Sequence, residues 1–87
     1  MKLKYEFAIK EVCGLWCAVP VGSAAGRYSG IINLNATAAD MMKMLSQDIT
    51  EEQLVQQMLA LYDVPEDALR RDVKAFIARL EAENVLA

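Results

Sequence analysis

The fold is decided by the stretch at residues 31–38, which reads IINLNATA. In the part of the chain that ends at Leu34, apolar residues tend to alternate with polar ones, which is typical of half-buried strands. After Asn35, apolar residues recur every three or four positions, which is typical of helices. Asn35 itself is a favourable N-cap residue, because its side chain can accept a hydrogen bond from the first helical turn. The sequence therefore predicts strands before this stretch and helices after it.

Three strands are expected in the first part of the chain, at about residues 2–11, 15–21 and 27–33. The first strand would bury one face formed by Leu3, Tyr5, Phe7 and Ile9. Cys13-Gly14 offers a tight turn into the second strand, which Pro20 ends or confines to an edge. Strands that follow one another so closely most simply form an antiparallel sheet.

Three helices are expected in the second part, at about residues 36–46, 51–62 and 65–83. The second helix has the clearest start, because Thr50 and Gln53 match the spacing of a capping box. The third helix begins with a proline in its first turn, where the missing N–H has no intrahelical partner. Together these elements predict an α+β fold, a three-stranded antiparallel sheet followed by three helices, in a single domain over residues 1–87.

The composition excludes several classes of function. The chain has no histidine, which rules out Ser–His or Cys–His nucleophiles and His-ligated metal sites. Cys13 and Cys17 stand alone, too few for a four-ligand zinc site. The many carboxylates of the helical part of the chain are typical of helix first turns and solvated helix faces and form no catalytic constellation. We therefore expect no enzyme activity, no metal and no cofactor.

The ends and the hydropathy of the chain indicate a cytoplasmic protein with a partner. The first residues alternate charge with apolar side chains, unlike a signal peptide, and no apolar run approaches the roughly 20 residues of a spanning helix. The mean hydropathy is +0.18 although the domain is small. That value indicates apolar surface left over for an interaction.

A sheet beside three helices is also the architecture of a winged helix-turn-helix, which suggests a DNA-binding regulator as an alternative. The charge disfavours DNA, since the net charge is −3 and acidic residues outnumber basic ones in the third helix. Its four basic residues are Arg70, Arg71, Lys74 and Arg79.

Five short motifs in order are similar to those of a known family. They are LNATA at 34–38, TEEQLV at 50–55, YDV at 62–64, DVKAF at 72–76 and VL at 85–86. With this order and spacing, residues 28–87 resemble the PqqD-like family of peptide-recognition elements. Two departures are Met41-Met42, where the family often has an aromatic or bulky aliphatic residue, and Asn84, where a glycine is common. Asparagine tolerates the left-handed conformation that glycine would supply.

The resemblance implies a winged helix-turn-helix-like fold that binds the leader segment of a ribosomally synthesised precursor peptide. In this family the leader adds as a strand to the edge of the third strand and packs on the third helix. The protein then presents the leader to a maturation enzyme, commonly a radical S-adenosylmethionine enzyme. A second alternative is an accessory subunit that completes another enzyme and binds no leader.

The peptide-binding residues expected on this basis come from the third strand and the third helix. They are Tyr28, Gly30, Ile31, Ile32, Asn33, Leu69, Arg70, Asp72, Val73 and Phe76. An unpaired strand edge is a template for strand addition, and alternate apolar side chains of a leader would enter the groove beside it. The basic residues of the third helix would then either select an acidic leader or simply form a solvated helix face. Asp72 borders the apolar stripe of that helix and is expected at a partly buried rim.

Overall fold

The computed structural model describes residues 1–22, 26 and 30–87. It confirms the predicted α+β architecture of a three-stranded antiparallel sheet followed by three helices. The elements are β1 (Phe7–Val12), β2 (Leu15–Pro20), β3 (Ile32–Leu34), α1 (Ala36–Met44), α2 (Glu51–Leu61) and α3 (Glu66–Ala82).

The sheet has the order β1-β2-β3, so β2 is central and β3 lies at an edge. The hairpin between β1 and β2 turns at Cys13-Gly14, as predicted, and both turn residues have positive φ, 54° and 80°. This is the backbone of a type I′ turn, whose twist matches that of the flanking strands. It pairs Val12 with Leu15 and sets the register of the whole hairpin.

The first strand was predicted too long, since β1 begins at Phe7 rather than near residue 2. The backbone before it is engaged elsewhere: the Leu3 amide donates to the Leu45 carbonyl at 3.0 Å, and the Lys4 amide donates to the Val85 carbonyl at 2.7 Å. Leu3 also forms an isolated bridge with Leu86. The alternating pattern of the residues before β1 therefore reflects packing against the end of α1 and the C-terminal residues.

The third strand also differs from its predicted range, residues 27–33. It covers Ile32–Leu34, and residues 27–29 lie outside the described residues. The strand extends to Leu34 because that residue pairs with Trp16 of β2. The third helix begins at Glu66, so Pro65 is its N-cap residue rather than a first-turn residue.

The predicted caps at Asn35 and Thr50 are confirmed in atomic detail. The Asn35 side chain accepts from the Ala38 amide at 2.7 Å, and Thr50 and Gln53 form the reciprocal bonds of a capping box at 2.9 and 3.0 Å. After α3, Asn84 has φ 57°. Its left-handed conformation lets the Val85 amide reach the Leu80 carbonyl at 3.1 Å, as in a Schellman motif. These contacts satisfy backbone groups that every helix end leaves unpaired.

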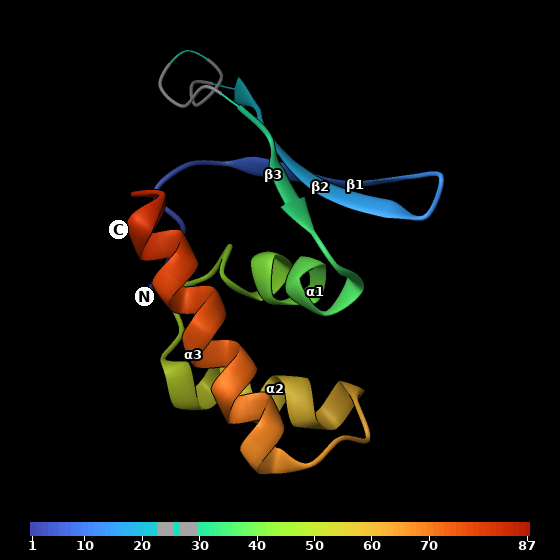
Figure 1. Ribbon diagram of the computed structural model, residues 1–87. Coiled ribbons are helices and arrows are strands. Elements are labelled where there is room, and N and C mark those ends of the chain that lie inside the picture. Colours follow the sequence, from blue (N-terminus) through green and yellow to red (C-terminus); the bar gives the residue numbers. More distant parts are fainter. Residues whose placement is uncertain (23–25, 27–29) are drawn as a thin grey trace.

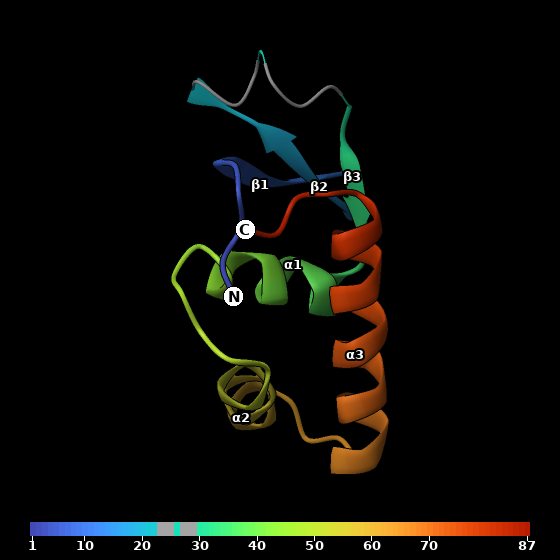
Figure 2. The ribbon, with the colours of Figure 1, turned by 90° about the vertical axis from the view of Figure 1, so that its left-hand side faces the viewer.

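The sheet and the helices share one core. Figure 1 shows α1 between the sheet and α2, while α3 runs alongside both helices. Buried side chains from β2, β3 and all three helices form a single cluster, and no charged or polar residue among those described is buried. In Figure 2, β3 and α3 lie on the same side of the molecule, which places a free strand edge next to a helix. No helix within the described ranges is long and apolar enough to cross a membrane.

Candidate functional site

The backbone of Asn33 faces the open side of the sheet. Because β2 is central, its residues bond alternately to β1 and to β3. The two-residue turn of the hairpin assigns the odd-numbered residues of β2 to β1, so Trp16 and Ala18 bond to β3. Their partners are Leu34 and Ile32. Asn33 lies between these two, so its N–H and C=O point away from β2.

Arg79 of α3 occupies this open edge. Its Nη2 donates a hydrogen bond to the Asn33 carbonyl oxygen at 2.8 Å, across 46 positions of sequence. The contact agrees with the outward direction deduced from the sheet register. The described part of the chain therefore presents one outward N–H of β3 to solvent and one outward C=O to an arginine.

A cavity of about 320 Å³ continues from this edge between α1 and α3. It is lined by Asn35, Thr37, Ala38, Met41, Asp72, Ala75, Phe76 and Arg79. The α3 members recur at intervals of three and four residues, which places them on one face of the helix. We call the Asn33 edge and this cavity together the β3–α3 groove.

The predicted site residues divide between the groove and the core. Asp72 and Phe76 line the cavity: Asp72 is exposed rather than partly buried, and Phe76 is only 6% exposed. Ile31, 59% exposed, precedes the edge strand, next to exposed Gly30. The side chains of Ile32, Leu69 and Val73 are buried and support the groove from within. Tyr28 lies outside the described residues.

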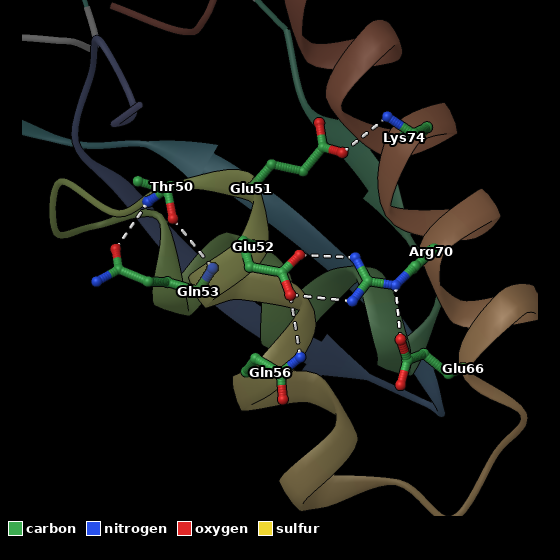
Figure 3. A network of polar contacts seen from close by, with 8 residues as sticks. All are labelled: Thr50, Glu51, Glu52, Gln53, Gln56, Glu66, Arg70 and Lys74. Atoms are coloured by element: carbon green, nitrogen blue, oxygen red, sulfur yellow. Dashed lines mark hydrogen bonds and ion pairs between the residues drawn. The ribbon is translucent and has the colours of Figure 1, made fainter.

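Arg70 lies away from the groove, at the contact between α2 and α3 (Figure 3). Its guanidinium donates to Glu52 at 2.7 and 2.9 Å and to Glu66 at 2.8 Å. The hydrogen bonds from Arg70, and then the one from Gln56, lower the pKa of Glu52 to about 2. Lys74 is held in the same way by Glu51 at 2.9 Å. Two of the four basic side chains of α3 are therefore paired with α2.

Two parts of the groove were not among the peptide-binding residues expected from the sequence. One is its α1 wall, made by residues that the sequence marked only as a helix start and core. The other is Arg79, which the sequence grouped with the other basic residues of α3. Arg71, exposed on the same helix, is not among the described residues that line the cavity. Charge alone does not separate Arg79 from Arg71, because the difference depends on which helix face meets β3.

A larger cavity, of about 500 Å³, lies between the N-terminal segment and α1. It is lined partly by Leu3, Tyr5, Phe7 and Met42, with Lys2, Lys4 and Lys43 among its charged residues. Size therefore does not single out the β3–α3 groove. What distinguishes the groove, among the described residues, is that a helix side chain that lines its cavity, Arg79, bonds to an outward backbone group of the edge strand.

Comparisons with known proteins agree with this fold and region. The family model described as coenzyme PQQ synthesis protein D (PqqD) matches residues 21–86. The solved structure titled "TbiB1 in Complex with the TbiA(beta) Leader Peptide" is similar to this chain with a TM-score of 0.71 and 17% sequence identity, covering 99% of this chain and 94% of that one. No curated protein matches. The family match covers well over half of the sequence and confirms the predicted resemblance: the chain belongs to the PqqD family.

Proposed function

We propose that this protein binds the leader segment of a ribosomally synthesised precursor peptide and presents it to a modifying enzyme, without catalysis of its own. The observation that carries the proposal is the open edge of β3, where Asn33 directs its backbone outward beside α3. An added strand would accept a hydrogen bond from the Asn33 N–H and donate one to its C=O. Main-chain pairing of this kind binds extended peptides of many sequences.

The groove supplies the side-chain contacts that main-chain pairing lacks. Successive side chains of an added strand point to opposite faces, so every second one would turn toward α1 and α3. Ala75 offers exposed apolar surface there, with the largely buried Met41 and Phe76 beside it, while Asp72 and Arg79 offer charge. We propose these residues together with Ile31 and Asn33 as the peptide-binding site.

Three further observations support a peptide rather than DNA. The family match covers β3 and α3 but not β1, so the groove belongs to the part that the family shares. The similar solved structure is, by its title, a complex with a leader peptide. On α3, the pairing of Arg70 and Lys74 with acidic residues of α2 removes positive charge that DNA phosphates would need.

The second partner that we propose is a maturation enzyme in the cytoplasm, of the radical S-adenosylmethionine class common in this family. The β3–α3 groove would hold the leader while the segment to be modified remains outside it. Binding through the backbone suits this role, because it fixes the leader without contacting the modified residues.

The proposal is tested by blocking each of the two free strand edges. A peptide is selected from a displayed library of short random sequences and titrated calorimetrically against three proteins: wild type, Asn33→Pro and Glu11→Pro. Alternation places the amides of both residues on free edges, Asn33 on β3 and Glu11 on β1. We expect loss of binding only in Asn33→Pro, since proline removes the outward donor. Unchanged binding by Asn33→Pro, with loss in Glu11→Pro, would move the site to β1. Selection of no peptide would reject the proposed function.

A further inference from the structure

We infer that Arg79 occupies the outward carbonyl of β3 and makes peptide recognition depend on an acidic residue in the bound peptide. The inference rests on the proposed function and names one residue that determines its specificity. In the free protein, the acceptor that an added strand needs is already bonded to Arg79 at 2.8 Å. A peptide that pairs with Asn33 must therefore share this carbonyl with the guanidinium or displace it.

Displacement has a different outcome for different peptides. A guanidinium that leaves the Asn33 carbonyl loses one charge-assisted hydrogen bond, and a neutral peptide offers it only uncharged acceptors in exchange. A peptide carboxylate beside Asn33 would accept two N–H groups of the same guanidinium, since arginine presents a planar fork that matches a carboxylate. Arg79 thus disfavours peptides without an acidic residue at this position and favours those with one.

Among the described residues, Arg79 is the cation of the groove that can make this contact. Arg70 and Lys74 are paired with α2, and Arg71 is not among the described residues lining the cavity. The remaining charged residue that lines it is Asp72, two helical turns from Arg79. A second acidic side chain of the peptide that approached Asp72 would be disfavoured by like-charge repulsion.

The position of the acid is thus specified as well as its presence. Net charge gives no such expectation, because the protein carries −3 overall and would repel acidic peptides at long range. Selection of an acidic residue by this chain must come from a local contact, and Arg79 is the cation placed for it.

The test compares libraries of short random peptides selected against wild type, Arg79→Ala and Arg71→Ala. Arg71→Ala removes the same charge from the same helix and serves as the matched control. We expect Asp or Glu to be enriched at one fixed position with wild type and Arg71→Ala, and this enrichment to vanish with Arg79→Ala. Arg79→Lys retains the charge and should retain a weaker preference. Circular dichroism checks that each variant is folded.

A selected peptide and its Asp→Asn or Glu→Gln counterpart then complete a double-mutant cycle. With wild type, we expect the neutral peptide to bind about fivefold more weakly, the upper range for an exposed ion pair. With Arg79→Ala, both peptides should bind alike, and the neutral one should bind at least as tightly as it binds wild type. Equal acid enrichment in Arg79→Ala would overturn the inference while leaving peptide binding intact. Selection of no peptide by any variant would overturn both proposals.

Discussion

Arg70 binds two carboxylates at once, one from α2 and one from its own helix. Its Nη1 lies 2.7 Å from Glu52 and its Nε lies 2.8 Å from Glu66. The fork geometry explains why Glu52 is the acid whose pKa falls furthest: two guanidinium N–H groups bond to its ionised form. This pairing joins α2 to α3 at the surface, so it is sensitive to pH in a way that the apolar core is not.

We expect the α2–α3 pairing to weaken in acid within a defined range. The pKa of Glu52 is lowered from 4.5 to about 2, so its ionised form is favoured by folding. The stabilisation is fully present above the unfolded value and is lost as the pH falls toward 2. Carbon-13 NMR titration of the Glu52 carboxyl should show the low pKa in wild type and a value near the ordinary one in Arg70→Ala. Arg71→Ala should leave the titration unchanged, and a wild-type Glu52 that titrates in the ordinary range would refute the pairing.

At the scale of elements, β3 combines two tasks in three residues. Ile32 and Leu34 bond to β2 and bury their side chains, whereas Asn33 directs both its side chain and its backbone outward. A strand this short contributes few hydrogen bonds to the fold, so each inward amide matters. The sheet does not use its outward groups, so they can pair with a peptide once Arg79 shares or releases the Asn33 carbonyl.

We therefore expect opposite effects from proline at two adjacent positions. Ile32→Pro removes an amide that bonds to Ala18 and a side chain that is only 2% exposed, and it should destabilise the protein by about 3 kcal/mol or more. Ile31→Pro changes a residue that precedes β3, has no partner in the β2–β3 ladder and has an exposed side chain, so the protein should remain folded. Thermal melts followed by circular dichroism distinguish the two variants. Equal melting temperatures would show that the register deduced for β3 is wrong.

The elements also show which features can be predicted from sequence. The caps at Asn35 and Thr50 and the turn at Cys13-Gly14 were predicted correctly, because each depends on residues no more than three positions apart. The start of β1 was predicted wrongly because the Leu3 amide bonds to Leu45, a partner that no local pattern indicates. Arg79 was not distinguished for the same reason, since its partner Asn33 is 46 positions away. The sequence predicted the strand edge at Asn33 and two cavity-lining residues of α3, Asp72 and Phe76. It did not predict the wall that α1 contributes.

The whole molecule has a single core into which both halves of the chain pack. Ala18 and Ile32 of the sheet belong to the same buried cluster as Leu80 of α3. The two ends of the chain are joined as well, since the Ala87 amide donates to the Lys2 carbonyl at 2.8 Å. A sheet of three short strands and helices of this length are each marginal alone. Stability therefore has to be shared across the molecule, and the groove between sheet and helix persists only while both are folded.

Because the core is shared, a destabilising substitution in α3 should also lower the stability of the sheet. Leu80 is fully buried, and Leu80→Ala should lower the free energy of unfolding by about 3 kcal/mol through the cavity it leaves. The single tryptophan, Trp16, reports on β2, while circular dichroism reports mainly on the helices. In urea, both signals should move to lower concentration by the same amount, because one cooperative unit unfolds. Leu61→Ala, at a side chain that is 60% exposed, should move neither midpoint by a comparable amount. If Leu80→Ala shifted the circular dichroism alone, the sheet would be an independent unit, and a peptide bound at β3 would not depend on the integrity of α3.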